Sequence, residues 1–446
     1  MFSPKVHEVA SALQVVFNRI ADDAAHESGF VQRQSKLTGD VFVRTLTFGW
    51  LHNPEATLEE LAQTAGDLGV PISPQGLDQR FGPRAAACLQ QVLDAAVTQV
   101  LAADPVAVPL LQRFPGGVCL MDSSTLTVPD ALAECWPGCG GTTKADGQAA
   151  IKLHVRFNVL DGSLRGPFLH PGRTADQTCD APLEALAPGA LRIADLAYFD
   201  LQQFADMNAQ GVYWLSRFQP GTRLYDSQGQ RWSLADFLAK QTGDVVDVQV
   251  HLGVKQRVPC RLLAKRVPAD VAEKRRERLR SRERHQGRKY RQADSWTLAE
   301  WTVYVTNVPQ ALLSLEEALV LARCRWQLEL LWKLWKSYGR IDESRSQNPW
   351  RVLCEIYAKL LGMVVQHWTL LASCWSQPDR SLAKASATVR RHAPELAATV
   401  RHGQLVRGVL QRIARCLTRG CRIAKRRRDP PTHQRLSSFA EAGRVR

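Results

Sequence analysis

The stretch Arg323–Ser337, RCRWQLELLWKLWKS, contains no proline or glycine and is rich in good helix formers, so it predicts a helix. At about 100° per residue, Arg325, Glu329 and Lys336 fall on one narrow stripe, and leucine and tryptophan fill most of the rest. A helix that is apolar nearly all round is usually buried. A carboxylate on it then needs a cationic partner, a proton or a metal ion. The alternative is an ordinary Arg–Glu pair on a solvated face.

Length and composition indicate a globular protein that handles a polyanion. The chain has 446 residues, enough for two or three domains, and a net charge of +15. The charge favours nucleic acid as partner, and the alternative is a generally basic soluble protein. No apolar run reaches the roughly 18 residues of a membrane span, and the N-terminus lacks a signal-peptide pattern. The eleven cysteines show no zinc-site spacing. We therefore expect a cytoplasmic, nucleoid-associated protein that contacts no membrane.

The N-terminal part of the chain predicts helices. Thr57–Asp67 opens with a Thr-x-x-Glu capping box, and Pro74–Phe81 follows after a short turn with a serine N-cap and proline at its first position. Two helices joined in this way outline a helix-turn-helix. Gln75, Gln79 and Arg80 on the second helix are predicted to bind DNA, because their side chains reach base edges or phosphates. The alternative is an ordinary helical hairpin.

The middle of the chain predicts a mixed α/β sheet. Apolar and β-branched runs bounded by turn residues predict strands, and helical patterns lie between the later ones. The predicted strands are Val118–Val128, Ile151–Leu160, Leu164–His170, the start of Ala190–Phe199, and Val212–Arg217, with helices over Asp176–Ala187 and Asp200–Gln210.

A β-rich insertion with a strongly basic segment follows this sheet. Strands are predicted at Val245–Leu252, Arg257–Leu263 and Trp301–Val308. The segment Lys274–Arg291 holds ten lysines and arginines against two acids, which predicts phosphate binding as a helix or an arm. Its alternative is a solvated helix without a partner. Arg275 and Arg276, in this segment, are among the predicted DNA-binding residues.

Three carboxylates distant in sequence could form one metal site. Asp122 follows the apolar start of a predicted strand, and Asp195 ends another. Acids are depleted in central strands, and sites in open α/β sheets form outside the strand ends. With Glu329 they would offer only oxygen ligands, which suit Mg²⁺, with Mn²⁺ as a substitute. Two such ions about 4 Å apart stabilise both oxygens in phosphoryl transfer.

These residues resemble the DDE transposases of bacterial insertion sequences, in the branch with a Tyr-x2-Arg-x3-Glu-x6-Lys signature. Arg325, Glu329 and Lys336 match its last three positions, and Ala322 replaces the tyrosine. The blocks MDSSTLTVPD and ADLAYFD resemble those around the two aspartates, and the likeness extends over about residues 40 to 345.

The resemblance implies an RNase H-like core with an inserted β-subdomain and two divalent ions at Asp122, Asp195 and Glu329. It implies metal-dependent cleavage of the element ends and transfer of the freed 3′-hydroxyls to target DNA by a dimer. Arg325 and Lys336 would clamp phosphates, as their chemistry allows. The element ends and the target are double-stranded DNA.

Trp296 and Trp301, in the insertion, could stack on an unpaired end base, with a subdomain-core role as the alternative. Together these observations divide the chain into five predicted segments. They are a helical DNA-binding region (1–110), the first part of the catalytic domain (111–219), the β-rich insertion (220–310), the second part of the catalytic domain (311–375), and a helical C-terminal region with a basic tail (376–446).

Two other functions fit the same residues. The first is a DNA-binding protein on this fold that no longer cuts, since Ala322 departs from the signature. The second is a nuclease that cuts without strand transfer. The expected activity of the chain is nevertheless that of a DNA transposase.

Overall fold

The computed structural model describes residues 4–33, 36–139, 148–179, 185–286, 292–375, 377, 379–423 and 432–442. Contacts group the chain into two compact units. Unit 1 comprises Met1–Ala107, Asp122–Leu183 and Trp326–His433, and unit 2 comprises Val108–Met121, Glu184–Arg325 and Gln434–Arg446. The five segments expected from the sequence stay a prediction.

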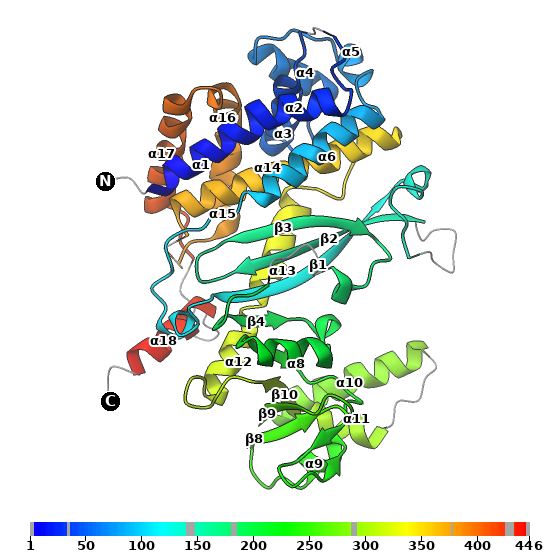
Figure 1. Cartoon of the computed structure of the whole chain (residues 1–446), viewed down its shortest axis with the longest axis vertical. Helices are drawn as coiled ribbons and strands as arrows, with labels where there is room; N and C mark the ends of the chain where they lie inside the picture. The colour runs from blue at the N-terminus through cyan, green and yellow to red at the C-terminus, as the bar shows by residue number, and fades with distance from the viewer. Residues whose placement is uncertain are drawn as a thin grey trace. The chain divides into compact units, whose positions relative to one another are not determined.

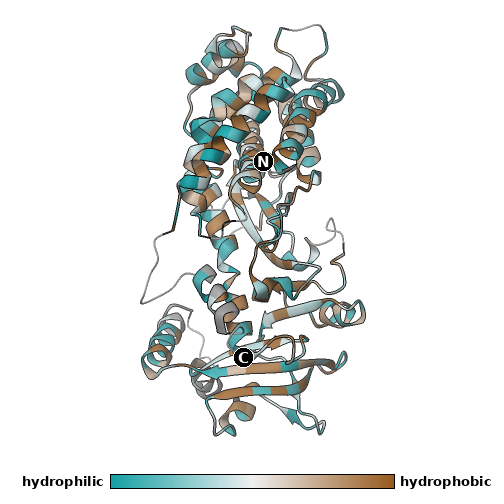
Figure 2. Ribbon diagram, turned by 90° about the vertical axis from the view of Figure 1, so that its left-hand side faces the viewer, coloured by the Kyte–Doolittle hydropathy of each residue, from teal (hydrophilic) through white to brown (hydrophobic). Residues whose placement is uncertain are grey.

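Unit 1 is mainly helical and is built around one long buried helix, α14 (Pro349–Ser373). Most of its residues from Val352 onward are buried, and α1, α3, α6, α15 and α17 pack against it. These neighbours are drawn around it in Figure 1, and Figure 2 shows helices with both apolar and hydrophilic stretches. The other helices are α1 (Pro4–Gln14), the π-helix η1 (Val15–Ile20), α2 (Ala21–Glu27), α3 (Gly39–His52), α4 (Leu58–Asp67), α5 (Pro74–Asp78), α6 (Pro83–Thr98), α13 (Trp326–Lys333), the π-helix η5 (Leu334–Tyr338), α15 (Leu382–Arg391), α16 (Ala393–Thr399) and α17 (Gly403–Arg419).

A two-stranded hairpin of unit 1 is fastened to α14. Strands β2 (Ala149–Asn158) and β3 (Leu164–Pro171) pair antiparallel. At their connection His367 of α14 contacts the carbonyl of Gly162 at 2.7 Å. Gly162 has a φ of +72°, and a Cβ there would lie 2.5 Å from the side chain of Leu371. Glycine is therefore required both for the turn and for its close approach to α14.

Unit 2 is a mixed sheet with helices. Its strand order is β1-β4-β5-β10-β9-β8-β6-β7, where β1 (Val118–Val128) enters unit 2 with its first four residues. β1, β4 (Leu191–Ala194) and β5 (Tyr213–Arg217) run parallel, and β10 (Trp301–Thr306) pairs antiparallel with β5. The remaining strands are β6 (Leu224–Tyr225), β7 (Arg231–Trp232), β8 (Val245–Leu252) and β9 (Val258–Arg266), and the helices are α7 (Pro109–Gln112), α8 (Leu201–Ala209), α9 (Leu234–Ala239), α10 (Ala269–Gln286), α11 (Gln292–Ala299) and α12 (Leu315–Arg323), while α18 (Thr432–Ala442) spans the boundary between the units.

The inserted strands share a core with the parallel strands. Phe204 of α8 stacks on Trp214 of β5, with ring centroids 4.1 Å apart, inside a cluster that extends to β8, β9 and β10. Arg261 of β9 is buried and pairs with Asp247 at 2.6 Å, and it also donates to two backbone carbonyls beyond β10. The buried guanidinium is thus compensated by Asp247, and its bonds to the two carbonyls hold the segment that leads into α12.

The predicted mixed α/β class is confirmed, and it agrees with an RNase H-like core. Strands were predicted at β1, β2, β3, β4, β5, β8, β9 and β10, and the predicted bounds of β1 and β8 match the observed ones. The capping box at Thr57 and the serine N-cap of α5 are also present. Apolar and β-branched runs, with alternation in β2, β8 and β9, were sufficient to predict these strands.

Two helix predictions were wrong. Asp176–Ala187 holds only a 3-10 turn, Asp176–Thr178, and residues 185–187 are not helical, while 180–184 lie outside the described residues. Arg323–Ser337 is not one helix, because α12 ends at Arg323, a turn follows, and α13 begins at Trp326. Nor is it buried all round, since Trp326 and Leu330 are 55% and 38% exposed. Trp326 and Leu330 therefore leave an apolar part of the α13 surface exposed to solvent.

Within the described part of the chain, no helix has the length and apolar character needed to cross a membrane.

Candidate active site and DNA-contact surfaces

Asp122 lies where β1 changes from buried to half-buried residues. The strand starts with four buried residues, Val118–Met121, and Asp122 then begins the part that belongs to unit 1. One carboxylate oxygen of Asp122 accepts from the backbone N–H of Ser123 at 3.0 Å. The other accepts from the indole Nε1 of Trp332 at 3.1 Å. Both oxygens are therefore oriented by donors.

The helix that carries Glu329 packs on this half of β1. Trp332 and Glu329 are three residues apart on α13, and residues so spaced are neighbours on a helix surface. One turn later, in η5, Lys336 donates to the carbonyl of Thr125 at 3.1 Å. Two bonds thus join α13 and η5 to β1, and they bring the helix face that bears Glu329 to Asp122.

A buried lysine holds the segment that follows η5. Lys359 of α14 donates to the carbonyls of Arg340 and Glu343, both at 2.8 Å, and pairs with Glu355 at 2.7 Å. Burial lowers the pKa of Lys359, although Glu355 opposes the shift. These bonds fix the end of the helix that carries Glu329 and Lys336.

A polar network that sequence reasoning missed lies beside Asp122. Ser123 donates to Asp176 at 2.7 Å, and Lys152 of β2 donates to the same carboxylate oxygen at 2.8 Å. Burial alone would raise the pKa of Asp176, but the bonds from Lys152 and Ser123 lower it overall. Asp176 is therefore a stable anion that ties β1 to β2. No sequence pattern marks this network, because its three members lie on β1, on β2 and in a 3-10 turn, far apart in sequence.

Asp195 follows β4 in unit 2. Its carboxylate caps the 3-10 turn η4 (Leu196–Tyr198) and accepts from the N–H of Leu196 at 2.8 Å. In the parallel pair of β1 and β4, Met121 is the register partner of Ala194. Each of these paired residues is followed in the chain by one of the two predicted aspartates.

The donors predicted for metal ions are all carboxylates. Hard divalent cations prefer such oxygen ligands, so Asp122, Asp195 and Glu329 fit magnesium or manganese by chemistry. Asp122 and Glu329 belong to unit 1 and Asp195 to unit 2. Among the described residues, no three His, Cys, Asp or Glu side chains lie close enough together to hold a metal ion.

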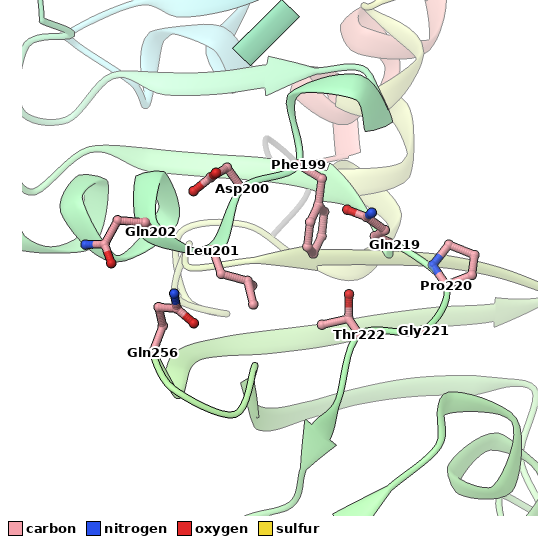
Figure 3. Close-up of a pocket in the computed structure, with 9 residues that line it drawn as sticks. All are labelled: Phe199, Asp200, Leu201, Gln202, Gln219, Pro220, Gly221, Thr222 and Gln256. Carbon is pink, nitrogen blue, oxygen red and sulfur yellow. The ribbon is translucent and has the colours of Figure 1, made fainter. Parts of the chain in front are cut away.

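A pocket of about 500 Å³ lies next to η4 in unit 2. Figure 3 shows its lining, with the side chains of Gln202, Gln219 and Gln256 among the polar groups and Phe199 among the apolar ones. Its one carboxylate, on Asp200, caps α8 by accepting from the N–H of Gln203 at 2.9 Å. With amides and no cation among its lining residues, the pocket lacks the chemistry of a phosphate clamp.

Predicted DNA-binding residues of the insertion lie in different settings. Arg275 donates to the carbonyl of Trp301 at 2.8 Å and to Thr302, so its guanidinium supports β10. Arg276 pairs with Glu300 at 2.5 Å. Trp301 is buried beneath the guanidinium of Arg266.

Trp296 differs from Trp301 because it is 37% exposed. The guanidiniums of Arg276 and Arg280 lie 5.4 and 5.0 Å from its ring centroid. A partly exposed indole flanked by cations retains the means to contact nucleic acid. Residues 287–291 of the predicted basic segment lie outside the described residues.

The remaining predicted DNA contacts lie at helix ends. Gln75, Gln79 and Arg80 are exposed on and just after α5 in unit 1. Arg325 is half-buried in the turn between α12 and α13, and Ala322 is buried in α12. The position that the signature gives to tyrosine thus faces the protein interior.

Known proteins resemble this chain over most of its length. Residues 113–364 match the family model described as "Transposase DDE domain". The chain is 26% identical over 434 residues to the transposase for insertion sequence element IS231F of Bacillus thuringiensis subsp. israelensis, covering 91% of this chain and 89% of that protein. It is 21% identical over 394 residues to the transposase for IS1151 of Clostridium perfringens, covering 80% and 78%. The matched range includes Asp122, Asp195 and Glu329.

Proposed function

Because this chain belongs to the DDE transposases, we propose that it binds the terminal inverted repeats of its own insertion sequence, cuts the DNA there and joins the 3′-hydroxyl ends to target DNA. The bond from Trp332 to Asp122 carries this proposal, since it holds the first predicted ligand against the helix of Glu329. The place of action would be the bacterial cytoplasm, where the DNA lies.

In the proposed site, two divalent cations are held by Asp122, Asp195 and Glu329. When bound, they would stabilise negative charge on the attacking and leaving oxygens of a phosphodiester. The proposal requires Asp195 to join the two acids of unit 1. It is supported by the strand register, in which the residues preceding Asp122 and Asp195 are paired.

The residues of the chain have separate tasks in this mechanism. Trp332 and the N–H of Ser123 orient the carboxylate of Asp122, so little reorganisation is needed when the substrate binds. Arg325 and Lys336 would neutralise phosphate oxygens next to the scissile bond. To reach a phosphate, Lys336 would exchange its bond to the Thr125 carbonyl, which is a neutral acceptor, for a stronger bond to a charged one.

The test uses purified protein and a DNA fragment that carries the sequences flanking the reading frame. We expect Mg²⁺-dependent cleavage by the wild type, and none by Asp122→Ala, Asp195→Ala or Glu329→Ala, with unchanged DNA affinity. Asp206→Ala is the matched control, because Asp206 is an exposed carboxylate on α8. Normal cleavage by any one of the three variants contradicts the assignment of the triad.

Two outcomes would favour the other functions. Wild-type protein that binds the repeat but never nicks it in Mg²⁺ or Mn²⁺ is a non-cutting DNA-binding protein. Protein that cuts, yet fails to join a pre-cut 3′-hydroxyl end to a target plasmid, is a nuclease. A joined product identifies the transposase. Mixing two variants inactivated at different sites tests whether the active protein is a dimer.

A further inference from the structure

Unit 1 contains a cleft of about 720 Å³ far in sequence from the three predicted catalytic acids. One wall is the chain segment that follows α2, from Gly29 to Arg33 and at Leu37. The other wall is the connection from α5 to the start of α6, from Gln79 to Ala85. The α4–α5 pair adjoins this connection in Figure 1. We call this feature the arginine cleft.

Three arginines give the cleft its charge, and they come from both walls. Arg33 and Arg80 are exposed, and the guanidinium of neither makes a hydrogen bond or ion pair with another described residue. Arg84 reaches the side-chain amide of Gln32 on the opposite wall, with its oxygen turned toward the guanidinium. Gln79 adds a further amide. The cleft therefore has three cations and two amides around one opening.

No acid lines the cleft among the described residues. The acid closest in sequence, Asp78, is directed elsewhere and pairs with Arg351 of α14 at 3.3 Å. Phe30 lines the cleft and packs against Phe42 of α3 with tilted rings, whose centroids are 4.3 Å apart, so this wall is attached to the helical core. A rigid cleft with uncompensated positive charge selects an anionic ligand.

The size and donor pattern favour a polyanion with several phosphates over a single ion. Guanidiniums and amides donate in pairs to phosphate oxygens. A cavity of this volume leaves most of its space empty around one such ion. Double-stranded DNA carries one charge for about every 1.7 Å of its axis, so its backbone could meet Arg33, Arg80 and Arg84 together.

Helix α5 by itself is a poor recognition helix. It spans five residues, Pro74–Asp78, little more than one turn, and its Leu77 is buried. Gln79 and Arg80, predicted as contacts of that helix, instead lie after its end and line the cleft. The surface near α5 is thus shaped for the backbone of a duplex as well as for its base edges.

We propose that the arginine cleft binds the phosphodiester backbone of double-stranded DNA, and that this contact positions α5 on the duplex. The proposal rests on the proposed function, because that function supplies DNA as the partner. It adds Arg33 and Arg84 to the DNA-contact surface and assigns Arg80 to phosphate rather than base contact. Its contribution to affinity is therefore independent of base sequence.

The test measures the affinity of the full-length protein for two short duplexes by fluorescence anisotropy over a range of salt concentrations. One duplex has the element end and the other an arbitrary sequence. We expect Arg33→Ala, Arg80→Ala and Arg84→Ala each to reduce the slope of log affinity against log salt by about 1, on both duplexes. Arg19→Ala in the π-helix η1 and Arg391→Ala at the end of α15, both exposed arginines away from the cleft residues in sequence, are the matched controls.

An unchanged slope in all three variants overturns the proposal, as does an equal loss in the control variants. A loss confined to the element end would show base reading and also overturns it. Binding of an acidic peptide that the same variants abolish, with DNA affinity unaffected, would make the cleft a protein-binding site. Thermal unfolding of each variant checks the fold, and Arg33→Ala, a change of an exposed residue outside the helices, is the least disruptive.

The result is separable from the outcome for the proposed function. The salt slope requires no cleavage, so it tests the cleft even if the wild type never cuts DNA. Conversely, the cleft variants retain Asp122, Asp195 and Glu329. Asp122→Ala, in turn, retains the arginine cleft, so it should keep the wild-type salt slope while it no longer cuts.

Discussion

Replacing Trp332 with phenylalanine tests the link between the two predicted ligands of unit 1. The change removes the indole N–H that donates to Asp122 at 3.1 Å and keeps an aromatic ring in the same place. Trp332 is nearly buried and packs edge-on against Trp335, with ring centroids 5.4 Å apart. The fold should therefore survive, while the Asp122 carboxylate loses the donor that comes from α13.

The magnitude follows from the kind of bond that is lost. A hydrogen bond to a charged group contributes about 1.5–3 kcal/mol. If the activation free energy of cleavage rises by this full amount, cleavage should slow by roughly 10- to 100-fold, since about 1.4 kcal/mol is a factor of ten. A carboxylate that is free to rotate also binds cations less well. The Mg²⁺ concentration for half-maximal cleavage should therefore rise.

The assay is single-turnover cleavage of a labelled element end as a function of Mg²⁺ concentration. Trp50→Phe is the matched control, because Trp50 is also buried and its indole nitrogen has no hydrogen-bond partner among the described residues. Both variants lose the same atoms, and only Trp332→Phe loses a hydrogen bond. DNA affinity, measured without metal, should not change in either.

Wild-type rates and an unchanged Mg²⁺ requirement in Trp332→Phe would refute the reasoning. The Trp332–Asp122 bond would then have no part in the site, and the main support for joining Asp122 to Glu329 would be lost. A slow control variant would refute it as well, because the cost would then come from lost packing.

Three further outcomes are expected. Burial lowers the pKa of His367 to about 4, below its unfolded value of 6.5. Because the unfolded chain binds the proton first, the free energy of unfolding should fall by up to about 3 kcal/mol as the pH drops from 6.5 to 4. In urea unfolding experiments, the free energy of unfolding of His367→Gln should depend less on pH over this range. Arg261→Met leaves the half-buried Asp247 carboxylate and two backbone carbonyls without their donor and should cost about 3 kcal/mol, seen as a lower Tm, whereas an unchanged Tm would mean that the pair is dispensable. Asp176→Asn removes the anion that holds Lys152 and should slow cleavage by about tenfold, with the Mg²⁺ requirement as second readout; normal kinetics would make the network purely structural.

Local pattern was enough for much of the architecture. The apolar run of β1 and the alternation of β8 predicted both strands with their observed bounds, because each pattern is contained in the strand's own sequence. The capping box at Thr57 was readable for the same reason, since both of its hydrogen bonds are local. The spacing of Arg325, Glu329 and Lys336 likewise depends on nothing outside its own segment.

Other features required the tertiary structure. In the described part of Asp176–Ala187 no α-helix forms, and Asp176 instead accepts bonds from Ser123 and Lys152, partners that no local rule includes. No sequence pattern singled out Trp332, yet its N–H reaches Asp122 across 210 positions of sequence. The grouping of Arg33, Arg80 and Arg84 arises from two segments brought together by helix packing.

By itself, the sequence determined the class of fold, the basic character and the three acids on which the chemistry of this transposase is proposed to depend. These properties are carried by residue type and short-range period. The tertiary structure alone decided which side chains orient Asp122 and where uncompensated positive charge gathers. Such contacts depend on how strands and helices pack, and the free energy of packing is a property of surfaces that meet only after the chain has folded.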